Sequence, residues 1–435
     1  MERRQPQERP VRWAWPTLGI LALTYMFSYL DRQILVLLVE PVRRDLRIDD
    51  TQFSLLTGLA FALFYAVAAF PLAILADRWS RKRLILIGVA LWGVMTMACG
   101  LSRSFGELFV ARMGVGLGEA ALTPTAYALI ADLFPKARQA RAMGLFVLGT
   151  FAGSALSLVL GGMVIGQVAK APDLLLPIGA VRPWQLVFLL IGGATLLLLV
   201  PLSRIVDPAP PRARRDAVAA PALGPWLWSQ RARYFALFLG IPFSSLAVYG
   251  MQAWLPALFV RAHGWSVADA GIRLGLATLG PGLVGVVLGG WLADRWRAAG
   301  RQEAALLLNA LVAAAMAPVP VLIAALPSAD AALLASGLFF FLSSVIVPLA
   351  PTALQAVTPP AIRARTAALF LLVVNLVGIG LGPTAVAAAS DHLLPWRGAL
   401  GPALALVGGL GFALSAALLF LGLPGYRRAL AADRV

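Results

Sequence analysis

The sequence predicts an all-α integral membrane protein with twelve transmembrane helices in two six-helix bundles. Three observations support this prediction. Of the 435 residues, 60% are hydrophobic and only 13% are charged, whereas a soluble domain has roughly 45–50% apolar and about 25% charged residues. The apolar residues form twelve long runs, each near the roughly 20 residues that span a bilayer. A short motif also recurs in both halves of the chain.

The first six runs are separated by short gaps that contain charged residues or proline. The first run follows a basic amino terminus and lacks a small-residue cleavage site. Since a signal peptide has an apolar region of only about 7–15 residues, we expect a retained span. The expected helices cover residues 14–38, 52–76, 84–101, 106–131, 142–166 and 184–203.

A polar stretch rich in proline and arginine separates these runs from six more. It has no apolar segment long enough to cross a bilayer, so we expect a linker. The expected domains are residues 1–203, the linker 204–232, and residues 233–435 with a short tail. The second set of expected helices covers residues 233–258, 270–293, 304–326, 331–356, 366–389 and 399–423.

The distribution of Lys and Arg predicts the orientation. If every run crosses once, the side with both termini carries 25 of the 36 basic residues and the other side 9. Basic residues are enriched on the cytoplasmic side of membrane proteins. We therefore expect both termini, the linker and the tail to be cytoplasmic. Orientation also accounts for the net charge of +16, so we expect no nucleic-acid partner.

An internal repeat links the two halves. The pentapeptide Leu-Ala-Asp-Arg-Trp ends the second run at 75–79 and the eighth at 292–296, an offset of 217 residues. A weaker echo pairs the start of the fifth run, at Arg141, with the start of the eleventh, at Arg365, at an offset of 224. The similar offsets indicate a parallel duplication, as in transporters whose substrate site lies between two six-helix bundles.

The loop after the second run resembles the major facilitator superfamily, whose motif there is Gly-x-x-x-Asp-Arg-x-Gly-Arg-Lys. The matching residues are Asp77, Arg78, Arg81 and Lys82, whereas Ala73 and Ser80 replace the glycines. The second copy keeps Gly290, Asp294 and Arg295. The resemblance implies the major facilitator fold and a secondary transporter.

Four stretches are similar to the Spinster-like branch of that superfamily. They are 29–32, 112–120, 131–134 and 378–383. Branch membership implies transport, and eukaryotic relatives of the branch move lysolipids such as sphingosine-1-phosphate. The excess of arginine over lysine, with abundant alanine, suggests a bacterial genome rich in G and C. We therefore expect a multi-pass protein of a bacterial inner membrane.

Four charged residues fall well inside predicted spans: Asp31, Arg32, Arg112 and Glu119. A charge inside a membrane is costly and should face a partner or water. At a rise of about 1.5 Å per residue, Asp31 and Arg112 lie about 10 and 9 Å from the outer ends of their helices, so they can meet. Glu119 follows Arg112 by about two helical turns on nearly the same face.

These charges allow a structural and a functional interpretation. The structural one is that two ion pairs lock the first helix to the fourth. The functional one rests on proton affinity, because burial raises the pKa of a carboxyl group and a nearby arginine lowers it. We favour the second, with proton coupling at Glu119 and Asp31 and substrate binding at Arg32 and Arg112.

The spans of the second half contain no comparable charge. Their polar side chains include Tyr249, Gln252 and Asn375, which we expect to contact substrate. A charged half opposite a mostly apolar half suits an amphipathic organic substrate that is lysolipid-like or drug-like. We expect alternating access, protons and membrane lipids as further partners, and a monomer.

Charged residues at the cytoplasmic ends of the spans predict a gate. Asp77 and Asp294 are placed to interact with the positive ends of the eleventh and fifth helices in the closed state. Asp132 is expected to pair with Arg78 or Arg81. Simple positive-inside enrichment would explain the arginines but not two equivalent aspartates. The predicted gating residues are Asp77, Arg78, Arg81, Asp132, Asp294 and Arg295.

The sequence disfavours several other functions. One cysteine, Cys99, and two histidines allow neither a disulfide within the chain nor a zinc site of Cys/His spacing, and we expect no cofactor, metal or catalytic residue. An uncoupled facilitator of the same fold is the first alternative. An intramembrane enzyme is disfavoured because both histidines fall in predicted outer loops. A sensor that has lost transport is disfavoured by the gating motifs.

Overall fold

The structure is a computed structural model that describes residues 13–168, 174–176, 179–207, 223–359, 362–394, 396 and 398–432. Its elements are helical except for a short antiparallel hairpin of β1 (Leu174–Leu176) and β2 (Gly179–Val181). Ten of the described helical segments are long and apolar enough to cross a membrane. The all-helical membrane fold is therefore confirmed, and the count of twelve crossings remains a prediction.

The amino-terminal group of helices corresponds to the first six predicted spans. Three of these spans, the second, fourth and sixth, consist of two successive helices with a short interruption, and a short additional helix, α2, follows the first span. The helices are α1 (Ala14–Leu37), α2 (Val39–Leu46), α3 (Asp50–Thr57), α4 (Leu59–Arg78), α5 (Arg81–Leu101), α6 (Phe105–Glu119), α7 (Leu122–Leu133), α8 (Lys136–Val168), α9 (Pro183–Leu197) and α10 (Leu199–Leu202).

The carboxyl-terminal group contains three π-helical segments, written η, among its α-helices. Its elements are α11 (Leu223–Ser229), α12 (Arg231–Phe235), η1 (Ala236–Gly240), α13 (Ile241–His263), α14 (Val267–Ala298), α15 (Ala304–Met316), α16 (Val319–Ala325), α17 (Ala329–Val345), α18 (Leu349–Ala356), α19 (Arg363–Asn375), η2 (Leu376–Leu381), α20 (Gly382–Ala388), η3 (Ala389–Leu393) and α21 (Leu400–Ala432). Most of the predicted linker lies outside the described residues.

Proline accounts for two of the π-helical segments. Pro242 and Pro383 are the second residues of α13 and α20, directly after η1 and η2. Proline has no N–H group and its ring crowds the carbonyl four residues earlier, so the preceding turn widens. Pro256 and Pro281 lie inside α13 and α14 without interrupting them.

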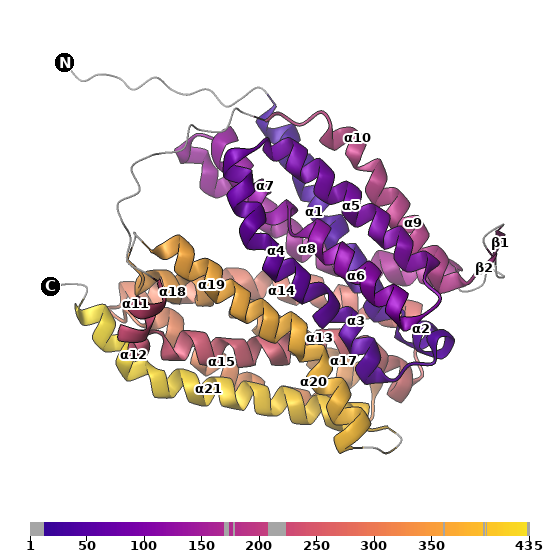
Figure 1. The fold of residues 1–435 in the computed structure, drawn as a ribbon. Helices are drawn as coiled ribbons and strands as arrows, with labels where there is room; N and C mark the ends of the chain where they lie inside the picture. The colour runs from indigo at the N-terminus through magenta and orange to yellow at the C-terminus, as the bar shows by residue number, and fades with distance from the viewer. Residues whose placement is uncertain are drawn as a thin grey trace.

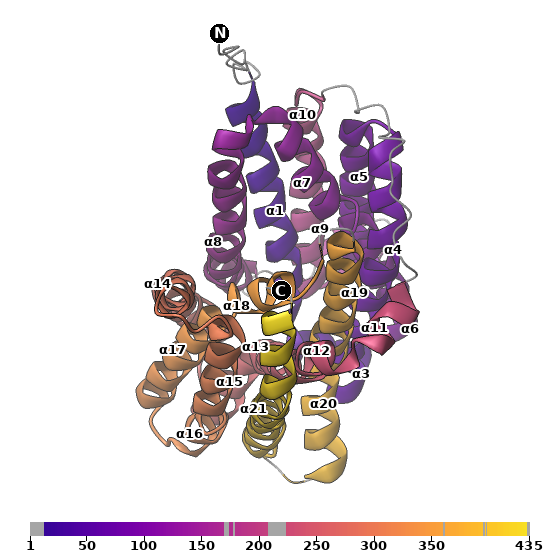
Figure 2. The same ribbon diagram turned by 90° about the vertical axis from the view of Figure 1, so that its left-hand side faces the viewer.

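The two groups of helices converge at the right-hand end of the molecule in Figure 1 and diverge at the left-hand end, which faces the viewer in Figure 2. We call the converging end, which carries α3 and α20, the outer end. The opposite end, near the start of α1, is the inner end. Two close backbone approaches occur towards the outer end. A Cβ atom on Gly271 would lie 2.7 Å from the carbonyl oxygen of Leu158, and one on Gly58 would lie 2.7 Å from that of Gly380. Glycine therefore lets α8 meet α14 and α3–α4 meet η2.

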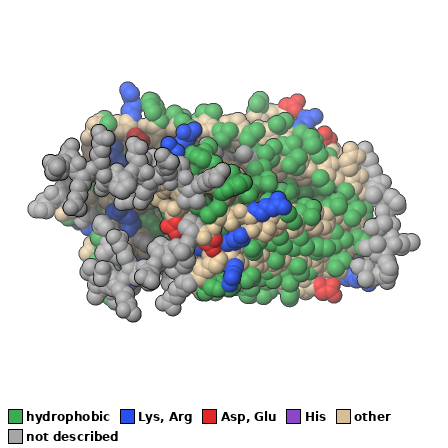
Figure 3. All heavy atoms as spheres, turned by 90° about the horizontal axis from the view of Figure 1, so that it is seen from above, with side chains coloured by type: hydrophobic (Ala, Val, Ile, Leu, Met, Phe, Trp, Pro, Cys, Tyr) green, Lys and Arg blue, Asp and Glu red, His purple; other side chains and the backbone are tan. Residues whose placement is uncertain are grey.

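The surface matches a lipid environment. Hydrophobic side chains cover most of the right-hand part of the face in Figure 3, and the charged ones lie mainly in its left and middle parts and at the edges. Large apolar residues such as Leu197, Val287 and Leu334 are each at least 70% exposed. Such broad apolar exposure is unusual for a soluble monomer.

Candidate functional site

The four charges predicted inside the membrane are brought together as two ion pairs. Arg112 Nη1 donates to Asp31 Oδ2 at 3.0 Å, and Arg32 Nη2 donates to Glu119 Oε2 at 2.5 Å. Both pairs join α1 to α6, the first and fourth predicted spans. Asp31, Arg112 and Glu119 are each at most 1% exposed.

The Asp31–Arg112 pair has further protein partners. Thr96 on α5 donates its hydroxyl to Asp31 Oδ1 at 3.1 Å. Arg112 Nε donates to the carbonyl oxygen of Leu56 in α3 at 3.4 Å. Because this pair is buried and connects four helices, it anchors the amino-terminal group of helices.

The Arg32–Glu119 pair is less completely satisfied. Ser28 donates its hydroxyl to Glu119 Oε2 at 2.5 Å, and Arg32 Nε donates to the same oxygen at 2.9 Å. Glu119 Oε1 is buried and has no hydrogen-bond partner in the described part of the chain. A buried polar atom left without a partner costs about 1–3 kcal/mol. This oxygen is therefore the atom of the pair that is left for a further partner.

Aromatic rings surround the Arg32 guanidinium. Its side chain is 19% exposed, in contrast to the Arg112 side chain at 1%. Rings at this distance attract a cation through their negative faces. The rings, with the distance from the guanidinium carbon to each centroid, are Phe61 (4.5 Å), Tyr65 (5.1 Å) and Tyr29 (5.4 Å).

Sequence analysis missed Ser28, Phe61, Tyr65 and Thr96. A helical spacing could have identified Ser28, because it precedes Arg32 by four residues and therefore shares its face. Thr96, Phe61 and Tyr65 lie on other helices, and only tertiary packing brings them to the charges.

The predicted polar residues of the carboxyl-terminal group are all half-buried: Tyr249, Gln252 and Asn375. The Tyr249 ring lies against η2 at Gly378, where a Cβ atom would come within 2.9 Å of the ring. Tyr249 also lies within electrostatic range of Arg32 and Tyr29. It is therefore the one of the three residues that the structure links to the charged site.

The predicted gating residues lie at the inner end. Arg81 forms an ion pair with Asp132 and donates to the carbonyl oxygen of Ala128 at 3.2 Å, which joins α5 to α7. Asp294 and Arg295 are exposed at the end of α14, and neither forms an ion pair within the described residues. The side chains of Asp77 and Arg78 lie outside the described part of the structure.

Ser80, which replaces a family glycine, has a specific contact. Its hydroxyl donates to Asp207 Oδ2 at 2.5 Å, and the backbone N–H of Lys82 donates to the same oxygen at 3.2 Å. Asp207 therefore binds the start of α5 from the residues that follow α10. This serine fixes the loop between the second and third spans to the end of the sixth.

Four charged residues at the outer end form what we call the outer clasp: Glu40, Arg43, Asp50 and Arg261. Arg261 on α13 binds Asp50 through two parallel contacts, Nη1 to Oδ2 at 2.6 Å and Nη2 to Oδ1 at 2.8 Å. Its Nε donates to Glu40 Oε1 at 2.6 Å, and Arg43 Nε contacts Asp50 Oδ1 at 2.8 Å. The clasp joins the carboxyl-terminal group to α2 and α3.

Further hydrogen bonds close the outer end. The backbone N–H and the hydroxyl of Thr51 donate to Asp391 Oδ2 at 2.7 and 2.8 Å, and Ser54 donates to Thr384 Oγ1 at 3.2 Å. Where both partners are described, every hydrogen bond and ion pair found between the two groups of helices lies at this end. Sequence analysis missed this network because its members lie at the ends of spans or in loops.

Comparisons with known proteins agree with this architecture. The Major Facilitator Superfamily matches residues 21–383. The chain is 31% identical over 429 residues to an MFS-type efflux pump of Mycolicibacterium smegmatis (strain ATCC 700084 / mc(2)155), covering 96% of this chain and 94% of that protein. It is 25% identical over 406 residues to protein spinster homolog 1 of Bos taurus, covering 86% and 73% of the two chains.

Two crystal structures are similar over nearly their whole length. Both are of a bacterial homolog to the human lysosomal transporter Spinster, in inward-facing occupied and inward-facing unoccupied conformations. Their TM-scores are 0.74 and 0.76 at 25% sequence identity, with 98% and 97% of both chains covered. These matches indicate a transporter rather than an enzyme, and the bacterial relatives support an inner-membrane location. The chain belongs to the Major Facilitator Superfamily, and within it to the Spinster-like proteins.

Proposed function

We propose that this chain is a proton-coupled secondary active transporter that moves an amphipathic organic molecule by alternating access. The observation that carries the proposal is the Arg32–Glu119 pair. It combines a buried carboxylate that has one unbonded oxygen with an arginine side chain that is 19% exposed. Such a pair can separate when Glu119 binds a proton and Arg32 binds an anion in place of the carboxylate.

The chemistry of the exchange follows from charge. Protonation of Glu119 removes the negative charge that holds Arg32, so the guanidinium becomes available to an anionic head group. Release of the proton restores the pair and displaces that group. Asp31 takes part because it interacts electrostatically with Glu119, so proton binding at one acid depends on the charge of the other.

Two residues have separate proposed roles around this exchange. Arg112 is buried and bonded in the present state, so we assign Arg32 as the first contact for substrate and Arg112 as a contact that requires movement of Asp31. Tyr249 is the proposed contact from the opposite helices. Gln252 and Asn375 are half-buried there and would extend the polar surface.

The substrate class follows from the asymmetry of the site. All four intramembrane charges belong to α1 and α6, whereas the facing spans offer polar but uncharged side chains among apolar ones. An amphipathic molecule satisfies both surfaces. The names of two relatives, an efflux pump and a Spinster protein, support a drug-like or lysolipid-like cargo.

Alternating access needs two gates, one at each end of the molecule, of which one is closed while the other is open. The outer clasp supports an outer end that is closed here. We assign Asp77, Arg78, Arg81, Asp132, Asp294 and Arg295 to the inner gate, which would close when the clasp opens.

The test is transport into proteoliposomes with and without an imposed pH gradient, using ethidium and a fluorescent lysolipid as separate probes. We expect the gradient to accelerate uptake by the native protein. Glu119→Gln should transport at a rate that no longer responds to the gradient, because glutamine cannot exchange a proton. Glu107→Gln, which alters an exposed acid at the start of α6, is the matched control and should respond normally.

Two outcomes would contradict the proposal. A Glu119→Gln variant with full gradient response would exclude this acid from coupling. Native transport at the same rate with and without a gradient would instead favour an uncoupled facilitator of the same fold.

A further inference from the structure

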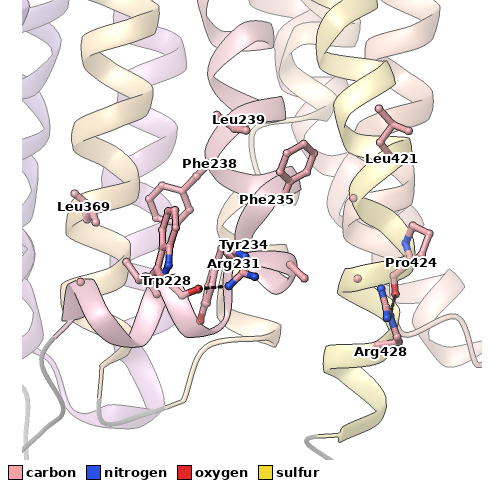
Figure 4. Close-up of a pocket in the computed structure, with 15 residues that line it drawn as sticks. Trp228, Arg231, Tyr234, Phe235, Phe238, Leu239, Leu369, Leu421, Pro424 and Arg428 are labelled. Atoms are coloured by element: carbon pink, nitrogen blue, oxygen red, sulfur yellow. Dashed lines mark hydrogen bonds between the residues drawn. The ribbon is translucent and has the colours of Figure 1, made fainter.

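A groove outside the charged site lies at the inner end of the carboxyl-terminal group. Its volume is about 790 Å³, and it is bordered by α11, α12, η1, α19 and the end of α21 (Figure 4). The charged side chains that line it are Arg231 and Arg428. Phe235, Leu239 and Leu421 form part of its apolar wall.

Two glycines shape the floor of the groove. A Cβ atom on Gly422 would lie 2.5 Å from the Cβ atom of Ala236, and one on Gly425 would lie 2.5 Å from the carbonyl oxygen of Ala232. Any larger residue would separate the helices. The glycines therefore hold α21 directly against α12 and η1, and the side chains that flank this contact form the walls.

Both arginines are exposed, and neither has an acidic partner among the residues that the structure describes. Arg231 Nη1 donates to the carbonyl oxygen of Trp228, and Arg428 Nε donates to that of Pro424, each at 3.4 Å. Neither guanidinium forms an ion pair with a residue that the structure describes. Each has donors left for an external anion, since a guanidinium carries five N–H groups.

The groove is polarised along the membrane normal. Arg231 begins α12, and Leu239 follows eight residues later, or about 12 Å deeper at 1.5 Å per residue. Leu421 lies seven residues before Arg428, about 10 Å deeper by the same measure. Figure 4 shows both leucines at the same side of the groove, away from both arginines. The charged end therefore lies at the membrane surface and the apolar end in the hydrocarbon.

We propose that this groove binds an anionic glycerophospholipid of the cytoplasmic leaflet. Arg231 and Arg428 would bind its phosphate, and an acyl chain would lie along Leu239 and Leu421. Basic pockets between transmembrane helices on this side suit such head groups. Trp228, 74% exposed, stands at the charged end, where tryptophan favours the membrane interface.

The site is independent of the transport proposal. It uses α11, α12 and α21, whereas the four intramembrane charges belong to α1 and α6. Charge complementarity also favours an anionic lipid, because a zwitterionic lipid offers no net charge to two guanidinium groups that have no acidic partner among the described residues.

The test compares dioleoyl phosphatidylglycerol with dioleoyl phosphatidylcholine, added to the full-length protein in detergent. Native mass spectrometry measures bound lipid, and thermal unfolding measures stabilisation. We expect the native protein to retain phosphatidylglycerol preferentially. The double variant Arg231→Ala, Arg428→Ala should bind it on the order of tenfold or more weakly. The control Arg83→Ala, Arg138→Ala removes two exposed inner-end arginines from the other group and should bind it normally.

A second measurement leaves both arginines in place. Brominated phosphatidylglycerol at low mole fraction should quench the fluorescence contributed by Trp228, obtained by subtracting Trp228→Phe, more than brominated phosphatidylcholine does. Equal quenching by the two lipids would overturn the proposal. So would equal loss of binding in both arginine double variants, or stabilisation by soluble glycerol phosphate alone, which would indicate a free anion as the ligand.

Discussion

Two ion pairs join α1 to α6, and their surroundings give them different properties. The Asp31–Arg112 pair is at most 1% exposed and has additional partners on α3 and α5. The Arg32–Glu119 pair has an unbonded carboxylate oxygen and an arginine side chain that is 19% exposed. The first is suited to anchoring helices and the second to exchanging partners.

Asp31→Asn should destabilise the protein strongly. The substitution leaves the Arg112 guanidinium buried without a counter-charge, which typically costs about 3–5 kcal/mol. Thermal unfolding in detergent measures the effect. Asp269→Asn, at an exposed acid near the start of α14, is the control and should change stability little.

The double variant Asp31→Leu, Arg112→Met separates stability from coupling. Replacing both charges by apolar side chains of similar size is often neutral, so we expect most of the lost stability to return. Gradient-driven transport should not return, because the acid that interacts with Glu119 is gone. A double variant as unstable as Asp31→Asn would refute the explanation by an unpaired charge.

The sequence could predict which residues are charged inside the membrane and that Asp31 and Arg112 can meet, because depth depends only on helical rise. It could not show that Glu119 pairs with Arg32. That choice depends on how α1 and α6 rotate about their axes, and packing against other helices sets the rotation.

Among the helices, the fourth predicted span is interrupted directly after Glu119. Glu119 is the last residue of α6, and α7 begins at Leu122. Pro124 explains the interruption, because it cannot donate a hydrogen bond to the carbonyl of Ala120, four residues earlier. The sequence prediction of one continuous helix over 106–131 is wrong in this detail.

Pro124→Ala should make α6 and α7 continuous. The new N–H at position 124 can bond to Ala120, so hydrogen–deuterium exchange around residues 120–124 should slow. We also expect slower transport, because the acid would then belong to a stiffer helix. Pro281→Ala is the control, since α14 is already continuous at that proline. Unchanged exchange in Pro124→Ala would show that other contacts cause the interruption.

At the scale of the whole molecule, the outer clasp determines which end is closed. Arg261 connects α13 to two acids on α2 and α3, and the remaining polar bonds between the groups lie nearby. The long apolar runs were sufficient to predict an all-helical membrane fold. They could not predict the clasp, because pairing between residues more than 200 positions apart is a property of the assembled fold.

Arg261→Ala should shift the protein towards a state that is open at the outer end. The Arg261 side chain is 25% exposed and that of Asp50 is 4% exposed, so losing the arginine from this partly buried pair costs about 1–2 kcal/mol, roughly a five- to thirtyfold change in the ratio of two states. Labelling of a cysteine introduced into the outer half of α3 measures the shift, because the native Cys99 is buried. Arg273→Ala, whose ion pair with Asp330 stays within one group of helices, should leave labelling unchanged.

One continuous rod, from α12 through η1 to α13, carries a guanidinium at each extremity, Arg231 and Arg261. Thirty residues at about 1.5 Å each separate them by about 45 Å, which equals the thickness of a bilayer with its head groups. A thinner bilayer could accommodate both arginines only if the rod tilted. Because a change in membrane thickness would change the tilt of this helical segment, it would also change the position of Arg261 in the outer clasp.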